Sequence, residues 1–241
     1  MARSASPWLR SAVRLGALIA LCSLALEVTF AVRVALMAVV DPHSTSFQRS
    51  EAWRLVQAGR FAWRQQWVDD TAISNHLRRA VIAAEDAGFT EHSGVEWEAI
   101  ERAWSKNTQR TQRPGKRPAK LVGGSTITQQ LAKNLLLSGE RTLLRKGQEL
   151  LITWALELLL NKRRILEIYL NQVEWGEGVF GAQAAARHYY RMDAAQLDGA
   201  AAARLAVLLP APKRYGRHPH SAFVSARAHA VLARMPDVDL P

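Results

Sequence analysis

An apolar run near the N-terminus constrains the fold of this chain more than any other feature. Residues 15–40 are mostly apolar and are interrupted by Glu27 and Arg33. A helix of this length would reach about 39 Å, which exceeds the roughly 30 Å of a hydrocarbon core. Residues 15–32, with Glu27 as their one charge, already approach the length that a bilayer requires. We therefore expect a single transmembrane anchor within 15–40.

The charges before this run predict the orientation of the anchor. Residues 1–14 hold Arg3, Arg10 and Arg14 and no acidic residue. The positive-inside rule then predicts a cytoplasmic N-terminus and a body on the outer, periplasmic side of the inner membrane. A cleaved signal peptide with 15–26 as its apolar core, or a buried core helix, are the alternatives. The small residues that signal cleavage needs lie inside the apolar run, which favours a retained anchor.

The residues beyond the anchor have the pattern of a mainly α protein. A polar connecting segment is expected over 41–70 and a helical domain over 71–241, where alternation typical of strands is hard to find. The expected helices span 76–85, 95–104, 125–137, 144–160, 162–173, 179–190, 194–209 and 221–235. Because 144–160 is apolar around much of its surface, we expect it to be a buried central helix.

The composition excludes some classes of protein and indicates the charge of the expected partners. A hydrophobic content of 49% with 22% charged residues excludes a disordered chain and a polytopic membrane protein. The net charge of +11 favours anionic partners, and a single cysteine excludes an intramolecular disulfide. Residues 102–120 hold seven basic and no acidic side chains, which predicts a mobile basic loop, either solvated or in contact with an anionic substrate or lipid.

Two glutamates are candidates for acid–base catalysis. Glu85 follows an apolar stretch, and Glu149 lies in the most apolar helix of the domain. Burial of an unpaired carboxylate raises its pKa, and proteins prepare acid–base groups in this way. A structural salt bridge is the alternative for each. Further carboxylates in the same or neighbouring helices are Glu157, Glu167 and Glu174. His92 alone is expected to be a structural hydrogen-bonding partner, and no metal site is predicted.

A possible anion site lies where Gly123 and Gly124 lead into a helix capped by Ser125 and Thr126. Free N–H groups at the positive end of a helix dipole attract anions. Cations further along the chain would suit a pyrophosphate; they are Lys133, Arg141, Arg145 and Lys146. The alternative is an ordinary capped helix with a basic surface. Carboxylates beside a cationic pocket suggest glycosyl transfer from a phosphorylated sugar.

Sequence motifs make the expected function more specific. Four complete motifs occur in order: E-D-x-x-F-x-x-H-x-G at 85–94, G-x-S-T-x-T-Q-Q at 123–130, R-K-x-x-E at 145–149 and K-x-x-I-L-E-x-Y-L-N at 162–171. A fifth, R-R-x-x-V-L at 227–232, is partial because Ala228 replaces the second arginine. Over roughly residues 65–235 the chain thus resembles the peptidoglycan glycosyltransferases of family 51, and among them the short monofunctional members.

The resemblance implies a lysozyme-like helical fold of two lobes around a cleft. It also implies polymerisation of lipid II into β-1,4-linked glycan, with inversion at the anomeric carbon and release of undecaprenyl pyrophosphate. Glu85 would be the general base for the acceptor 4-hydroxyl, and Glu149 would assist departure of the pyrophosphate. The implied substrate-binding residues are Lys133, Arg141, Ser125, Gln130, His92, Arg145 and Lys146.

Some properties stay open at this stage. The sequence does not decide whether the protein uses a divalent cation such as Mg²⁺. The expected partners include the membrane and other cell-wall synthesis or division proteins, but not nucleic acid. The length leaves no room for a transpeptidase domain, so none is expected. Two other functions remain as alternatives: a lysozyme-like lytic transglycosylase that cleaves glycan, and a non-catalytic membrane-anchored cell-wall scaffold.

Overall fold

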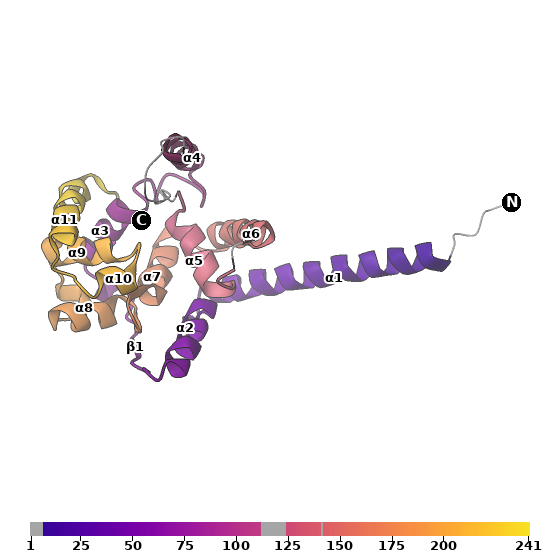
Figure 1. Ribbon diagram of the computed structural model, residues 1–241, viewed down its shortest axis with the longest axis horizontal. Helices are drawn as coiled ribbons and strands as arrows, with labels where there is room; N and C mark the ends of the chain where they lie inside the picture. Colours follow the sequence, from indigo (N-terminus) through magenta and orange to yellow (C-terminus); the bar gives the residue numbers. More distant parts are fainter. Residues whose placement is uncertain (1–6, 112–123, 141) are drawn as a thin grey trace.

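The computed structural model describes residues 7–111, 124–140 and 142–241, which form a mainly helical body behind one long N-terminal helix (Figure 1). The α-helices are α1 (Pro7–Leu36), α2 (Ser46–Gln57), α3 (Asn75–Glu85), α4 (Trp97–Thr111), α5 (Ile127–Leu136), α6 (Leu143–Leu159), α7 (Lys162–Gln172), α8 (Ala182–Tyr190), α9 (Gly199–Leu208), α10 (Pro212–Tyr215) and α11 (Ala222–Arg234). The strands are β1 (Arg64–Gln65), β2 (Glu174–Gly176) and β3 (Val179–Phe180), and short 3-10 turns span Asp70–Ala72, Ala194–Gln196 and Met235–Asp237. The expected mainly α fold class is confirmed.

Helix α1 projects away from the body (Figure 1). The segment Arg10–Leu36 contains an 18-residue window with a mean hydropathy of 2.2, and none of this window is buried. By length and composition it is able to cross a membrane, in agreement with the single anchor predicted from the sequence. The base of the helix is joined to the body, because Val34 and Met37 belong to the buried core and α1 contacts α6.

The helices of the body pack in two groups (Figure 1). In one group, α9 packs against α3 and α11; in the other, α5 packs against α2, α6 and α7. Three alanines of α9, Ala202, Ala203 and Ala206, are fully buried and let the neighbouring helices approach closely. Helix α3 buries Leu77 and Val81 in the same core. The end of α3 meets the start of α5 through Asp86, which accepts a hydrogen bond from the backbone N–H of Ile127.

A small sheet of strand order β1-β3-β2 joins the two groups. Strand β1 pairs parallel to β3, and β2 pairs antiparallel to β3. Gly178 and Gly181 have φ values of +72° and +83°, which L side chains rarely adopt, and a Cβ at either position would collide with backbone oxygen. The helix expected over 179–190 is therefore wrong at its start, because the two-residue strand and Gly181 precede α8.

Helix α6 is not the buried central helix that its composition predicted. One face is buried, with Ile152 and Leu156 in the core, but Leu143, Leu144 and Leu158 are 92%, 79% and 84% exposed. Hydropathy does not distinguish an apolar surface that packs on protein from one that faces another apolar medium. The exposed leucines lie on the helix that the base of α1 contacts.

The basic segment 102–120 is also not a loop over its whole length. Residues 102–111 continue α4, and Arg102 forms ion pairs with Glu96 and Glu98. No helix breaker occurs before Pro114, so the periodic pattern that starts at Trp97 continues. Residues 112–120 lie outside the described residues.

Candidate active site

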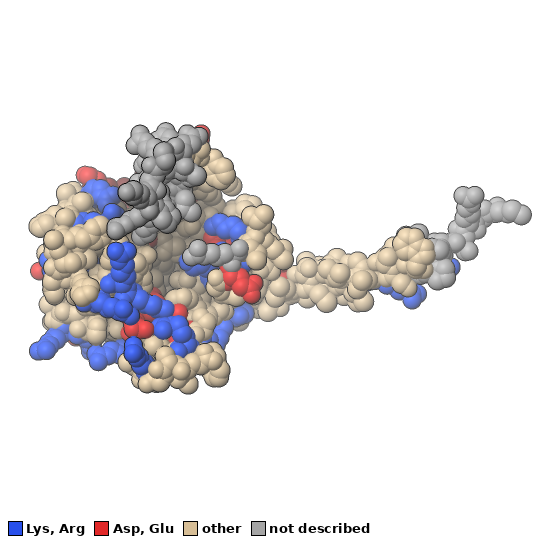
Figure 2. Space-filling model, in the orientation of Figure 1, with Lys and Arg blue, Asp and Glu red and all other residues tan. Residues whose placement is uncertain are grey.

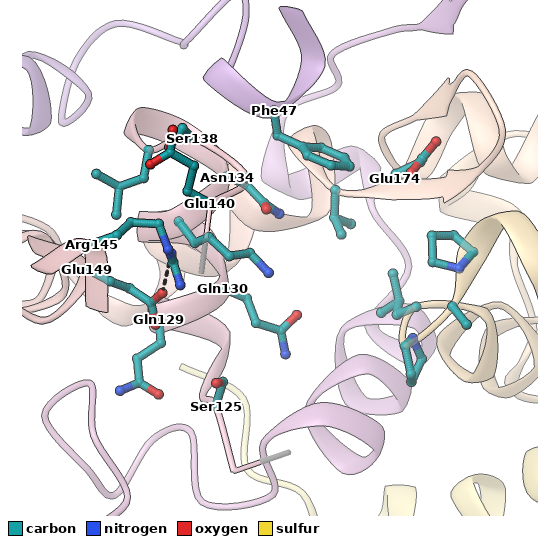
Figure 3. Close-up of a pocket in the computed structure, with 18 of the residues that line it drawn as sticks. Phe47, Ser125, Gln129, Gln130, Asn134, Ser138, Glu140, Arg145, Glu149 and Glu174 are labelled. Carbon is teal, nitrogen blue, oxygen red and sulfur yellow. Dashed lines mark hydrogen bonds and ion pairs between the residues drawn. The ribbon is translucent and has the colours of Figure 1, made fainter. Parts of the chain in front are cut away.

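A cavity of about 720 Å³ lies between α5 and α6 on one side and α2, β2 and α10 on the other (Figure 3). Its walls hold six of the candidate residues: Ser125, Gln130, Lys133, Arg145, Lys146 and Glu149. Lys and Arg side chains gather on this face of the body with acidic side chains among them (Figure 2). Glu85 and His92 do not line the cavity wall, and Arg141 lies outside the described residues.

Glu85 stands directly behind the cavity wall. It is the last residue of α3, whose apolar face carries it into the protein. Its Oε2 accepts a hydrogen bond of 2.8 Å from Nε2 of Gln130, while its Oε1 is buried and has no hydrogen-bond partner in the described part of the chain. The hydroxyl of Tyr169 in turn donates to Oε1 of Gln130 at 3.0 Å. Gln130 therefore fixes Oε2 of Glu85, and Oε1 is free to accept a proton.

The surroundings of Glu85 set its proton affinity. Burial raises the pKa of the Glu85 carboxyl above its usual value, and the hydrogen bond from Gln130 opposes this shift. The charge of Asp86 raises the pKa further, and the charges of Arg227 and Lys133 lower it. Burial also raises the pKa of Tyr169, so its hydroxyl remains a donor. The result is a carboxylate with enhanced basicity, the property that a general base needs.

Asp86 and His92 form a separate, structural pair. Oδ2 of Asp86 accepts a 2.9 Å hydrogen bond from the backbone N–H of Ile127 at the start of α5, and Oδ1 lies 2.8 Å from Nε2 of His92. The N–H of Gly94 donates to Nδ1 of His92 at 3.1 Å. Nε2 must then carry the hydrogen, which assigns a neutral imidazole that donates to Asp86. His92 thus lies against Asp86, and the charge compensation for Glu85 comes from other residues.

The loop after α3 is tied to the N-terminus of α5. Thr126 caps this helix in a capping box with Gln129, and its Oγ1 also donates to the carbonyl of Gly94 at 2.6 Å. Gly94 has a φ of +85°, and a Cβ there would lie 2.7 Å from Cγ2 of Thr153. Glycine is therefore required, and the first two motifs meet through hydrogen bonds between a side chain of one and the backbone of the other.

Two of the alternative carboxylates are occupied in structural contacts. Oε1 of Glu157 accepts from Thr128 at 2.6 Å and from Nζ of Lys162 at 2.8 Å. Oε2 of Glu167 lies 2.7 Å from Arg164. The third alternative, Glu174, lines the cavity.

Glu149 holds two cations at the cavity wall. It is 3% exposed, and Arg145 and Lys146 precede it by one helical turn. The guanidinium of Arg145 lies 2.9 Å from Oε2, and the ammonium of Lys146 contacts Oε1 (the Arg145 contact is dashed in Figure 3). With Lys133 in the same wall, this side of the cavity presents more positive than negative charge. It is suited to an anionic group of the pyrophosphate type.

A divalent cation does not fit this arrangement. Among the described residues, no group of three or more His, Cys, Asp or Glu side chains is placed to hold a metal ion. Hard cations such as Mg²⁺ prefer several oxygen ligands, and the carboxylate of Glu149 is already flanked by two cationic side chains.

Several residues of the site were not identified from the sequence. Phe47 reaches the cavity from α2, within the segment expected to be a connection, and Lys213 reaches it from α10. Tyr169 belongs to the fourth motif, but its link to Gln130 appears only in three dimensions. In the fifth motif, Ala228 is buried and Arg227 is exposed. The remaining arginine, Arg227, lowers the pKa of Glu85 through its charge.

The chain resembles known proteins over most of its length. A family model described as Transglycosylase matches residues 54–236. The chain is 48% identical over 231 residues to the biosynthetic peptidoglycan transglycosylase of Paraburkholderia phytofirmans, covering 95% of this chain and 93% of the relative. It is 51% identical over 220 residues to that of Burkholderia pseudomallei (90% and 83%) and 52% identical over 202 residues to that of Bordetella pertussis (83% and 82%).

Proposed function

Because the chain belongs to the transglycosylase family and is a peptidoglycan transglycosylase, we propose that it polymerises lipid II into β-1,4-linked glycan strands, with inversion at the anomeric carbon and release of undecaprenyl pyrophosphate. The proposed activity is glycosyl transfer without transpeptidation. The observation that carries the proposal is the buried, unpartnered Oε1 of Glu85, which lies behind Gln130 of the same α5 and α6 wall that presents cations to the cavity.

In the proposed reaction, Glu85 is the general base. Its Oε1 takes the proton of the acceptor 4-hydroxyl, and the acceptor oxygen attacks C1 of the growing chain. The bond between C1 and the pyrophosphate oxygen breaks on the opposite face, so the configuration at C1 inverts. Gln130 and Tyr169 keep the carboxylate oriented through the contacts at 2.8 and 3.0 Å. General-base catalysis of this kind contributes typically about 10²–10⁴-fold to rate.

The cations stabilise the leaving group. Negative charge develops on the pyrophosphate as the bond to C1 breaks, and Lys133, Arg145 and Lys146 line the cavity where it would lie. Such preorganised charge is usually a large part of catalysis. Glu149 keeps Arg145 and Lys146 at the wall through its two ion pairs, so its proposed role is to position these cations. A glycan-cleaving enzyme has no pyrophosphate to bind, so the cationic wall favours synthesis over lysis.

The membrane-facing parts of the protein support a lipid-linked substrate. Helix α6 presents Glu149 to the cavity and Leu143, Leu144 and Leu158 to the outside. The base of α1 contacts the same helix. We place the apolar face of α6 against the outer leaflet of the inner membrane, with the N-terminus in the cytoplasm. A substrate with its lipid tail in the bilayer would then enter the cavity from the side of α6.

The test is polymerisation of fluorescent lipid II by the purified full-length chain. We expect a ladder of products that muramidase digestion removes, and no ladder with Glu85→Gln. The matched control is Glu91→Gln, which changes an exposed glutamate six residues away. Absence of polymer from the folded wild-type chain would overturn the proposed function. Turnover by Glu85→Gln within about tenfold of wild type would remove Glu85 from the role of base.

A further inference from the structure

The side of the cavity opposite Glu149 holds another buried carboxylate, Glu174 (Figure 3). Glu174 begins strand β2 and is 3% exposed. The proposed mechanism does not use it. Phe47 from α2 and Lys213 from α10 line the cavity together with it. This wall therefore combines a buried carboxyl group and an aromatic ring with two cations, Lys213 and Arg214, and its aromatic ring distinguishes it from the wall of α5 and α6.

The carboxyl group of Glu174 has few partners: a backbone hydrogen bond from Gly178 and the more distant ammonium of Lys213. The ammonium of Lys213 lies 3.9 Å from Oε2 of Glu174 but 2.5 Å from Oε2 of Glu51, so its charge is mainly committed to Glu51. Oε1 of Glu174 is buried without a hydrogen-bond partner in the described part of the chain. A buried polar atom without a partner is costly, and in a cavity wall it marks a place for a ligand.

The protonation of Glu174 selects the class of ligand. Burial raises the pKa of the Glu174 carboxyl to about 7, although the charge of Lys213 lowers it. Near neutral pH the group is therefore partly a neutral acid, which both donates and accepts hydrogen bonds. Sugar hydroxyl and acetamido groups are partners of this mixed kind, whereas a pyrophosphate offers only acceptors. The ring of Phe47 adds an apolar surface of the type found in ligand pockets.

The two elements that carry this wall are fixed against each other. Gly176 in β2 and Gly216 after α10 both lie against the hydroxyl of Tyr189, so closely that a Cβ on either glycine would collide with it. This hydroxyl donates to the carbonyl of Trp175 at 3.0 Å. The positions of Glu174 and Lys213 are thus set by backbone packing before any ligand arrives, as a binding site requires.

We propose that Glu174, together with Phe47 and Lys213, forms a carbohydrate-binding subsite for the glycan part of the substrate, separate from the cations that meet the pyrophosphate. The subsite rests on the proposed function for the nature of its ligand. It contacts sugar hydroxyl or acetamido groups, and the pyrophosphate lies at the opposite wall.

Calorimetric binding of two soluble probes to the full-length chain tests the subsite. One probe is a tetrasaccharide of alternating N-acetylglucosamine and N-acetylmuramic acid without lipid or phosphate, and the other is inorganic pyrophosphate. We expect Glu174→Met, which keeps the volume and removes both polar atoms, to weaken tetrasaccharide binding about tenfold, as the loss of a buried hydrogen bond predicts. Pyrophosphate binding should stay unchanged. Glu174→Gln, which keeps a donor and an acceptor, should bind the tetrasaccharide within about threefold of wild type.

Controls separate this proposal from its alternatives. Glu177→Gln alters an exposed carboxylate three residues away and should change neither probe. If Glu174→Met fails to fold, Phe47→Leu tests the same wall and should also weaken only the tetrasaccharide. Equal tetrasaccharide binding by wild type and Glu174→Met, equal loss of both probes, or no tetrasaccharide binding by wild type overturns the subsite. Because binding is measured without turnover, a failure to polymerise lipid II overturns the proposed function independently.

Discussion

The hydroxyl of Tyr169 donates to Oε1 of Gln130 at 3.0 Å, and this contact determines which end of the Gln130 amide faces Glu85. With Oε1 occupied by Tyr169, Nε2 is the atom that reaches Oε2 of Glu85 at 2.8 Å. A donor there holds the carboxylate in place, whereas the amide oxygen would repel it. The fourth motif therefore acts on the first through the second.

We expect Tyr169→Phe to lower kcat for lipid II polymerisation by about tenfold, because the amide is then free to rotate and the base loses its fixed orientation. Stability should fall by about 1 kcal/mol, the usual net value of one hydrogen bond. Steady-state polymerisation and thermal unfolding measure the two effects. The control is Tyr190→Phe, which removes the hydroxyl of a tyrosine that is only partly buried. Unchanged kcat in Tyr169→Phe would contradict the orienting role.

This contact illustrates what was predictable from the sequence. The helix that ends at Glu85 and the Thr126 cap follow from local periodicity and capping chemistry, and both are observed. The link between Tyr169 and Gln130 joins residues 39 positions apart, and local patterns carry no information on such pairs. For the same reason, the sequence did not identify Phe47 and Lys213, which are far apart in the chain and line one cavity.

Two of the errors about the fold have different physical causes. Helix α6 is apolar around much of its surface, and the pattern alone does not tell which medium each face contacts. The strand Val179–Phe180 is too short to show alternation, and its start is determined by a glycine turn against Ala62. Both depend on tertiary surroundings that the sequence pattern does not contain.

The pH dependence of turnover should report the ionisation of Glu85. The base must be ionised, and burial raises its pKa, so kcat/KM should fall as the pH is lowered, with an apparent pKa above that of an ordinary glutamate. The charge of Arg227 lowers the pKa of Glu85. Arg227→Gln should therefore shift the acidic limb of the profile to higher pH. A limb that stays in place, measured with lipid II at constant ionic strength, would contradict this electrostatic link.

Glu174 should make the stability of the protein depend on pH. Its pKa is about 7 in the folded state against an ordinary value of 4.5, so the folded state binds the proton more tightly than the unfolded state. The resulting stabilisation is complete below about pH 4.5 and is lost as the pH rises through 7; it amounts to about 3 kcal/mol. The charged groups around the carboxyl are Lys213 from α10 and Glu51 and Arg54 from α2, with the hydroxyl of Tyr189 from α8 nearby.

We therefore expect Glu174→Gln to flatten this dependence and to unfold at a higher temperature than wild type at pH 8. Unfolding of both proteins is followed at several pH values in the same detergent. The difference between the two curves isolates Glu174 from other titrating groups. Parallel curves across pH 5 to 8 would show that Glu174 does not carry a raised pKa.

Gly94 is a position where the backbone tolerates no side chain. Its φ is +85°, and a Cβ would lie 2.7 Å from Thr153 and 2.9 Å from Glu157. Gly94→Ala should destabilise the protein by about 2–4 kcal/mol through backbone strain and overpacking together. The matched control is Gly147→Ala in α6, where nothing lies within 4 Å; there alanine should stabilise the helix by up to about 1 kcal/mol. Denaturation curves of the two variants should therefore move in opposite directions.

The exposed face of α6 should contact lipid. Trp154 lies on this helix and is 48% exposed, with Leu158 one turn further on. In vesicles of brominated phospholipid, which quench tryptophan fluorescence by contact, Trp154→Phe should remove part of the quenching seen in the wild-type chain. Trp53→Phe on α2 should leave the quenching unchanged, although Trp53 is 64% exposed.

A double variant, Leu144→Gln with Leu158→Gln, tests the consequence for activity. Both side chains are exposed, so unfolding in detergent should change by less than about 0.5 kcal/mol per site. Removal of apolar surface weakens contact with the bilayer by about 25 cal/mol for each Å², so polymerisation of lipid II in vesicles should fall several-fold. If Trp154→Phe leaves the quenching intact and the double variant is fully active in vesicles, α6 does not lie against the membrane, and the proposed entry of the lipid-linked substrate beside it is wrong.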